Sequence, residues 1–280
     1  MTGRAAPLPG QRSWQRQAAF DVRDAVYGIA LRLSVLAALL ALWQLLTSLS
    51  DSPFFPTFTE TVTRLWNNWI TSPTLIQGHL VPSLFRLLAG WLAAVVVGVA
   101  VGTLIGMSNR LRDYVDPVVQ FMRSIPPPAL LPLFIVLLGI GDQMKVAMIL
   151  FGVVWPILLN TVDGVRSVDS LQLDTARIFG FPRQDVLFRV VLPSAGPKIF
   201  AGLRVSLSIA VILMVISEMV ATLNGVGFTL VQAQRTFRTV DVWAGILLLG
   251  LIGYGLNAGL GVLERRALRW QRGAQRLDER

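Results

Sequence analysis

The stretch LQLDTARIFGFPRQDVLFRVVLPSAGPK, from Leu171 to Lys198, is a charged, amphipathic segment inside an otherwise apolar chain. The chain has 280 residues, of which 54% are hydrophobic and 15% charged, and its mean hydropathy is +0.61. A soluble domain of this size carries more charge and fewer long apolar runs. The segment therefore indicates a structured loop of a membrane protein, and such a loop favours a partner that docks on it.

Six uncharged stretches approach the roughly 20 residues that a helix needs to cross the hydrocarbon core of a membrane. They cover residues 33–50, 87–108, 124–141, 146–162, 205–217 and 242–263. Backbone polar groups find no water inside lipid, and the stretches lack the alternation typical of barrel strands, so each one predicts a helix. The expected fold is an all-α membrane protein with about six transmembrane helices.

The basic residues predict the orientation of these helices. They gather before the first stretch, at Arg110 and Arg112, along residues 166–198 and from Arg265 to Arg280, whereas the alternate loops carry few. Cytoplasmic loops of membrane proteins are enriched in Lys and Arg, so both termini are expected in the cytoplasm. The same distribution indicates that the net charge of +9 serves a lipid membrane surface and not nucleic acid.

The expected organisation is a basic cytoplasmic arm at residues 1–25, a transmembrane domain at 26–263 and a basic tail at 264–280. The cytoplasmic loop within the domain covers about 162–198. The first apolar run starts late and lacks a small-residue cleavage pattern, which argues against a cleaved signal peptide. The sequence has no cysteine and a single histidine, His79, so we expect no catalytic residue, no metal site and no cofactor in this chain.

Small residues recur along the second apolar stretch, at Gly90, Gly98, Gly102 and Gly106. Small side chains at four- or eight-residue spacing let another helix approach closely. The partner helix belongs either to the same subunit or, in the alternative, to a second subunit.

The third apolar stretch begins with Arg-Ser-Ile-Pro-Pro-Pro at residues 123–128, after an expected cytoplasmic turn at residues 109–113. Consecutive prolines cannot continue an α-helix, so this span is expected to be broken or bent. Irregular backbone at membrane depth needs protein or a water-filled cavity around it, which predicts that the stretch faces the bundle interior. The alternative is a simple loop followed by a short helix.

Residues 171–193 predict two short helices joined by a tight turn. Ser170 is the expected N-cap of the first helix, and Gly180 is the expected left-handed residue that ends it. The second helix is expected at about 183–191, and Pro193 is expected to stop it before the next span begins at about residue 201.

The spacing in this loop resembles the E-A-A-x3-G-x9-I-x-L-P loop of the membrane subunits of ATP-binding cassette importers. Here it reads Asp174-Thr175-Ala176, three residues, Gly180, nine residues, Val190, one residue and Leu192-Pro193. Asp174 replaces Glu, Thr175 replaces Ala and Val190 replaces Ile. The stretches 79–86, 123–134, 139–141, 202–204 and 217–219 are similar to the nitrate/sulfonate/taurine-type permeases, so the resemblance covers about 79–270.

The resemblance implies a permease subunit of a type I importer in the bacterial cytoplasmic (inner) membrane. Two permease subunits, expected as a homodimer, would form the pathway, and a cytoplasmic ATPase dimer would bind the 171–193 loops. An extracytoplasmic substrate-binding protein would deliver the solute, an organic sulfonate, taurine or nitrate, with a heteroaromatic vitamin precursor as the next choice. ATP and Mg²⁺ would bind the partner ATPase, because this chain has no G-x4-G-K-[S/T] phosphate loop.

Glu218, Arg123 and Asn160 are candidates for the transport pathway. A carboxylate near the middle of a membrane helix is costly unless it is paired, hydrated or protonated. Glu218 is therefore either a pathway residue or a polar residue bonded to a neighbouring helix, with Arg123 or Arg204 as its partner. Arg123 attracts an anion or lies at the cytoplasmic interface, and Asn160 is expected to cap or bond a helix. The alternative function is an ion-coupled secondary transporter, which would show several intramembrane acids and inverted repeats.

Overall fold

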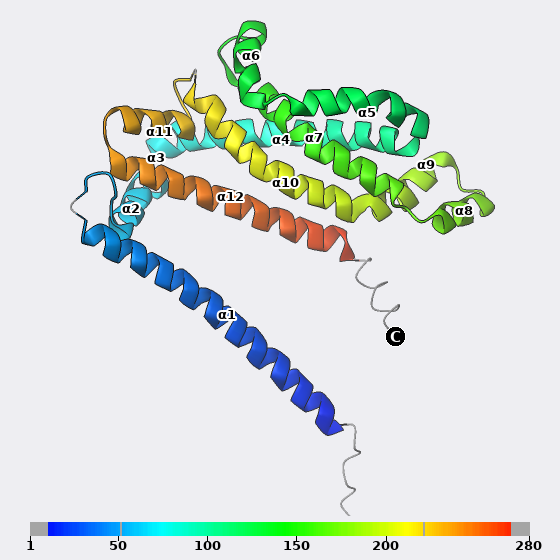
Figure 1. Ribbon diagram of the computed structural model, residues 1–280, viewed down its shortest axis with the longest axis horizontal. Helices are drawn as coiled ribbons and strands as arrows, with labels where there is room; N and C mark the ends of the chain where they lie inside the picture. The colour runs from blue at the N-terminus through cyan, green and yellow to red at the C-terminus, as the bar shows by residue number, and fades with distance from the viewer. Residues whose placement is uncertain (1–10, 51, 221, 270–280) are drawn as a thin grey trace, which may run out of the picture. The chain divides into compact units, whose positions relative to one another are not determined.

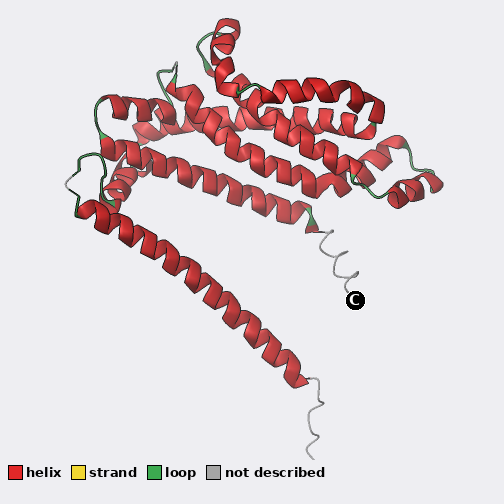
Figure 2. Ribbon diagram, viewed as in Figure 1, coloured by secondary structure: helices red, strands yellow, loops and turns green. Residues whose placement is uncertain are grey.

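The computed structural model describes residues 11–50, 52–220 and 222–269, which form helices and loops with no strand among them (Figures 1 and 2). The chain divides into two compact units, residues 1–62 and 63–280. The first contains α1 (Gln11–Ser48) and the start of α2 (Phe58–Leu65), and the Trp43 indole bonds the carbonyl of Pro56 within it. The helix α1 includes residues 11–25 of the expected basic arm, while residues 1–10 of the arm and 270–280 of the tail lie outside the described residues.

The second unit contains the rest of the helices. In chain order they are η1 (Trp66–Ile70), α3 (Pro73–Leu75), η2 (Ile76–Leu80), α4 (Val81–Met107), α5 (Asn109–Ser124), η3 (Pro127–Leu130), α6 (Leu131–Leu138), α7 (Asp142–Arg166), α8 (Ser170–Ile178), α9 (Arg183–Asp185), η4 (Val186–Val191), α10 (Leu192–Met219), α11 (Val226–Arg235) and α12 (Thr239–Ala267).

Within the described residues, four helical segments are long and apolar enough to cross a membrane, or five if the bent pair α5 and α6 counts as one span. The four are Pro73–Met107, Asp142–Arg166, Arg183–Met219 and Thr239–Ala267. The remaining expected span falls in α1, which contains the apolar stretch Leu33–Ser48. The all-α membrane fold is confirmed, and the structure supports four or five spans where the sequence predicts about six.

The core of the second unit lies where α4, α7 and α10 pack against one another (Figure 1). The glycines of α4 make this possible. A Cβ at Gly102 would come within 2.8 Å of the Leu158 carbonyl oxygen in α7, and one at Gly90 would meet Ile149 at the same distance. Gly98 and Gly106 face α7 in the same way. The small-residue spacing therefore serves packing within the subunit, the first of the two alternatives.

The third span is broken at its prolines, as predicted. The axes of α5 and the helical segment Pro127–Leu138 meet at 83°, and the ring of Pro127 lies close to Gly152 of α7. Only the proline end of the break packs against the bundle, because Arg123 and Ser124 are exposed. The expected turn at residues 109–113 is wrong: these residues begin α5, and the Ser108 hydroxyl caps the helix by accepting from the Leu111 N–H at 3.3 Å.

Pro193 does not stop a helix, contrary to the sequence prediction. The helix continues without interruption over 37 residues from Arg183 to Met219. Proline interrupts an α-helix because it lacks an N–H and clashes with the carbonyl four residues earlier. Here the wider π-turn η4 precedes Pro193. The Leu192 N–H bonds Leu187 O, five residues back, so the hydrogen bonds before the proline do not follow the i to i−4 pattern of an α-helix. The same arrangement, η2 followed by Pro82, opens α4.

Candidate functional site

Two regions of the second unit carry unusual local chemistry, and they lie at opposite ends of it (Figure 1). One is the segment of residues 171–193, here named the coupling segment, which forms most of α8, α9, η4 and the start of α10. The other is a group of buried charged residues at the end where α10 stops and α11 begins.

The coupling segment begins with a side-chain cap. The Asp169 carboxylate accepts a hydrogen bond from the Leu171 N–H at 2.9 Å, and Asp169 has extended backbone angles. Asp169 is therefore the N-cap and Ser170 the first helical residue, one position from the sequence prediction. A carboxylate at this place also interacts favourably with the positive end of the helix dipole.

The helix α8 ends in a Schellman motif, which explains the spacing of Ala176 and Gly180. The Phe181 N–H bonds Ala176 O and the Gly180 N–H bonds Arg177 O, both at 3.0 Å. Gly180 has φ +70°, the left-handed conformation that the sequence predicts for it. The Ala176 side chain is buried, and α8 packs against η4.

The exposed surface of the coupling segment includes large apolar side chains beside charged ones. Ile178 and Phe179 at the end of α8 are 84% and 74% exposed, and Leu171 and Phe188 are also exposed. Thr175, Ala176, Val190 and Pro193 line one groove between α8 and the start of α10. Asp174 is exposed and pairs with Arg177 of the same helix at 2.9 Å, and Leu192 is half-buried. Exposed apolar side chains in a patch indicate a binding surface.

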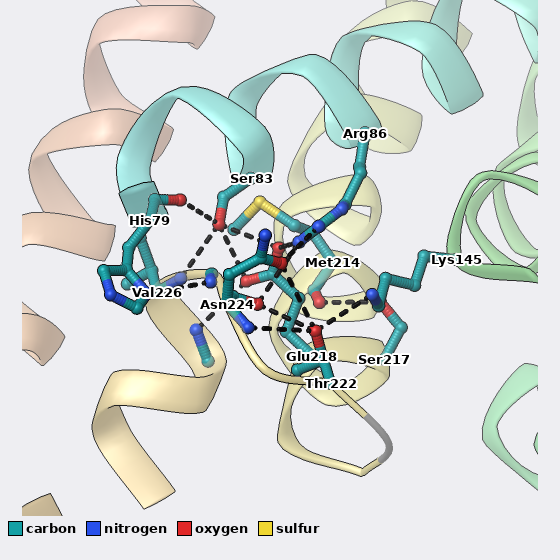
Figure 3. Close-up of polar contacts among 12 residues, drawn as sticks. His79, Ser83, Arg86, Lys145, Met214, Ser217, Glu218, Thr222, Asn224 and Val226 are labelled. Carbon is teal, nitrogen blue, oxygen red and sulfur yellow. Dashed lines mark hydrogen bonds and ion pairs between the residues drawn. The ribbon is translucent and has the colours of Figure 1, made fainter. Parts of the chain in front are cut away.

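The opposite end of α10 carries Glu218, in the last turn of the helix and not near its middle (Figure 3). Its side chain is fully buried, and Oε1 lies 2.7 Å from Arg86 Nη1 of α4. The Ser83 hydroxyl lies 2.8 Å from both carboxylate oxygens. The predicted partners are wrong: Arg204 pairs with Glu264 of α12, and Arg123 is exposed at the end of α5.

Two further charged residues complete this group. Arg86 Nε lies 2.7 Å from Asp142 Oδ1 at the start of α7, and Lys145 Nζ lies 3.8 Å from the same oxygen. Arg86, Asp142, Lys145 and Glu218 are named the far-end cluster. Two positive charges face two negative ones; Arg86, Lys145 and Glu218 are buried and Asp142 is exposed, and such pairing is what the buried charges require. The cluster is formally neutral and leaves no net charge to hold an anionic solute.

The far-end cluster holds the loop of residues 222–227. Three successive backbone N–H groups bond side chains of other helices: Gly225 to His79 Nδ1 at 3.1 Å, Val226 to Ser83 Oγ at 2.9 Å and Gly227 to Glu218 Oε2 at 3.1 Å. Arg86 Nη2 donates to Asn224 Oδ1 at 2.5 Å, and Lys145 Nζ donates to Thr222 Oγ1 at 3.0 Å. These bonds satisfy N–H groups that would stay unbonded at the start of α11.

Asn160, the remaining candidate, donates from Nδ2 to Pro156 O at 2.8 Å, within α7. Its side chain also lies against Gly202 of α10, where an added Cβ would come within 2.8 Å of the Asn160 Cβ. The structure thus places Asn160 at a helix contact, away from both the coupling segment and the far-end cluster. Ser83, Arg86, Asp142, Lys145 and Asn224 were not among the sequence candidates.

Comparison with known proteins agrees with this architecture. Residues 94–269 match the family described as binding-protein-dependent transport system inner membrane component. A protein of Bacillus subtilis named for aliphatic sulfonates transport, SsuC, is 33% identical over 247 residues, covering 88% of this chain and 89% of that one. The taurine transport system permease protein TauC of Escherichia coli is 33% identical over 248 residues, 86% of this chain and 90% of the relative.

A third relative carries a different solute name. The bicarbonate transport system permease protein CmpB of Synechococcus elongatus is 31% identical over 260 residues, covering 88% of this chain and 92% of that protein. Among solved structures, an inward-facing form of the MetNI methionine ABC transporter aligns with a TM-score of 0.62 at 20% identity, covering 71% of this chain and 99% of the aligned chain. At this identity the likeness establishes the fold.

The fold and the matched residues define a membrane subunit of the type I ATP-binding cassette importers. The chain belongs to the family of binding-protein-dependent transport system inner membrane components, as a multi-pass permease protein of the inner membrane. Such subunits are not enzymes themselves, because ATP hydrolysis belongs to a separate partner chain.

Proposed function

We propose that this chain forms the translocation pathway for ATP-driven uptake of a small oxyanion, with an organic sulfonate such as taurine as the first choice and nitrate as the next. The relatives named for sulfonates, taurine and bicarbonate support this proposal, because all three solutes are small and carry an anionic oxygen group. The observation that carries it is the 33% identity to the taurine permease over 86% of the chain.

The coupling segment is the proposed binding surface for the ATPase dimer, which binds ATP and Mg²⁺. Support comes from the exposed Ile178 and Phe179, which would lose water on docking, and from the groove lined by Thr175 and Pro193. Because caps at both ends fix α8, a force on the coupling segment reaches the bundle instead of unfolding the loop. A homodimer of this chain and an extracytoplasmic substrate-binding protein complete the proposed assembly.

The proposed cycle is alternating access. ATP binding closes the ATPase dimer and draws the two coupling segments together, and hydrolysis releases them. The coupling segment continues into α10, so its displacement carries the membrane helices with it. Solute enters from the binding protein when the side opposite the ATPase is open.

Ligand identification tests the solute. The partner binding protein, purified without added solute, is expected to retain a sulfonate, taurine or another small oxyanion, identified by mass spectrometry. Proteoliposomes that contain the permease, its ATPase and internal ATP are expected to accumulate that solute. Uptake driven by an ion gradient with no ATPase present would contradict the proposal and favour a secondary transporter.

Crosslinking tests the docking surface. The sequence contains no cysteine, so Thr175→Cys introduces a single thiol, on the exposed side of α8. It is expected to form a crosslink with a cysteine placed in the apolar surface groove of the ATPase. Thr236→Cys, exposed at the end of α11, is the matched control and should give none. The absence of a Thr175→Cys crosslink in every nucleotide state would refute the docking surface.

A further inference from the structure

One continuous helix joins the two candidate sites. The segment Arg183–Met219 starts inside the coupling segment and ends one residue after Glu218. Its 37 residues, at 1.5 Å of rise each, span about 55 Å. The segment contains the π-turn η4 and Pro197 but is unbroken, so a displacement of residues 183–193 along the helix axis is expected to reach Glu218 as well.

Glu218 also determines the position of the next helix. Its carboxylate bonds the N–H of Gly227 in the first turn of α11, and Ser83 and His79 bond the two preceding N–H groups. Gly225 has φ +117°, and a Cβ there would collide with the Glu218 carboxylate. The loop 222–227 therefore keeps these hydrogen bonds only while Glu218 of α10 and Ser83 of α4 stay in their present positions.

The cluster is suited to opening and closing. The side chains of Arg86, Lys145 and Glu218 are 3% exposed or less, so they have given up hydration for their mutual attraction. In such pairs the desolvation cost nearly offsets the Coulombic gain, and separation into water has a small net cost. Two states of similar free energy are what a modest external force can interconvert. An apolar contact of the same size would strongly resist opening into water.

We propose that the far-end cluster is a lock on the loop 222–227, closed in the arrangement seen here and opened when α10 is displaced from the coupling segment. Arg86 and Glu218 are positioning residues in this proposal: they hold the loop and α11 and do not touch the solute. The inference rests on the proposed function, since it takes the force on the coupling segment from the ATPase. The lock is the proposed place where that force releases the loop 222–227.

The first test uses the assembled complex of permease and ATPase in liposomes. Glu218→Gln keeps the size of the side chain but removes the charge that Arg86 pairs with, and it replaces one acceptor oxygen with an NH2 donor. Without a closed lock, ATP hydrolysis in the absence of binding protein is expected to rise about fivefold or more. Stimulation by the binding protein is expected to fall correspondingly. Arg86→Gln should give the same change, and the double variant no more than either single one.

The matched control breaks a different ion pair of α10, the one between Arg204 and Glu264 of α12. Glu264→Gln removes the charge that pairs with Arg204, which ties α10 to α12 away from the far-end cluster. The control is expected to leave basal hydrolysis and binding-protein stimulation at wild-type values. A rise as large as that of Glu218→Gln would show that any break along α10 has the same effect and would overturn the assignment.

The second test follows the loop directly. Val226 is fully buried, and in the cysteine-free chain Val226→Cys provides one thiol that reacts with maleimide only when the loop lifts. Its labelling in the wild-type background is expected to be slow without nucleotide and about tenfold faster with ATP trapped. Adding Glu218→Gln should make it fast in both states, and this readout does not depend on the ATPase rate. Equal labelling in all conditions would overturn the lock.

Different outcomes would refute the lock and the proposed function. If the wild-type complex shows the Thr175→Cys crosslink and ATP-driven uptake while Glu218→Gln keeps normal stimulation, the lock is wrong and the proposed function stands. If no crosslink and no ATP-driven uptake are found, the proposed function fails first.

Discussion

The coupling segment and the far-end cluster are held in opposite ways. In the coupling segment the backbone of α8 is capped by its own neighbours, Asp169 and Gly180, and the apolar side chains of Leu171, Ile178 and Phe179 are exposed. At the far end the backbone of residues 225–227 is held by polar side chains of α4, η2 and α10, of which Ser83 and Glu218 are buried. Changes in the first region should therefore act locally and on partner binding, whereas changes in the second should act on stability and on coupling.

The largest effect is expected from Arg86→Ala. The variant leaves the Glu218 carboxylate buried without its main charge partner, which costs about 3–5 kcal/mol in comparable buried pairs. Thermal unfolding of the detergent-solubilised permease should shift strongly downward, with a partial recovery in the Arg86→Gln/Glu218→Gln double variant. A loss of less than about 1 kcal/mol in the free energy of unfolding would show that water reaches the Arg86–Glu218 pair. The far-end cluster would then not differ in stability from the exposed pairs of the coupling segment.

The next effect is expected at the end of α8. Gly180→Ala forces a Cβ into a left-handed conformation, at a cost of about 1–2 kcal/mol. The Schellman motif should loosen, and the affinity for the ATPase, measured by co-purification titration, should fall about tenfold. Gly141→Ala is the control, because Gly141 has extended backbone and open space around it. An unchanged ATPase affinity for Gly180→Ala would show that the Schellman motif at the end of α8 is not needed for docking.

A smaller effect is expected at the start of α8. Asp169→Ala removes the hydrogen bond to the Leu171 N–H and should cost about 1 kcal/mol of local stability, seen as faster amide exchange in α8. Ser170→Ala should change little, because Ser170 lies inside the helix. Faster amide exchange for Ser170→Ala than for Asp169→Ala would show that Ser170 is the N-cap.

The smallest effect is expected for Arg177→Ala. The Arg177–Asp174 pair is largely exposed on both sides, and such pairs contribute about 0–1 kcal/mol. Stability should be unchanged within that range. A loss of ATPase binding without loss of stability would instead show that Arg177 contacts the partner.

The features that the sequence predicts correctly are those set by neighbouring residues. The first short helix of residues 171–193, observed as α8, the left-handed Gly180 and the break at the prolines of 123–128 follow from local backbone preferences. The predicted stop at Pro193 is wrong because a π-turn in the preceding residues accommodates the ring, and hydrophobic periodicity does not show such a turn.

The far-end cluster could not be predicted in the same way. Arg86 and Glu218 are 132 residues apart, so their pairing depends on which helices pack together. A usable signal was present: Arg86, Asp142, Lys145 and Glu218 stand near the ends of apolar stretches and carry balancing charges. Because successive membrane helices run in alternating directions, these positions place all four charged residues at the same end of the bundle. No comparable pattern in the described residues indicates which solute is carried.

The most direct test of the claim that α10 carries displacement from the coupling segment to the far-end cluster is the number of solute molecules taken up per ATP hydrolysed. Measured with the complete assembly in proteoliposomes, Glu218→Gln is expected to assemble and hydrolyse ATP while uptake per ATP falls about tenfold. A wild-type ratio in that variant would contradict the account and remove Glu218 from the transport mechanism.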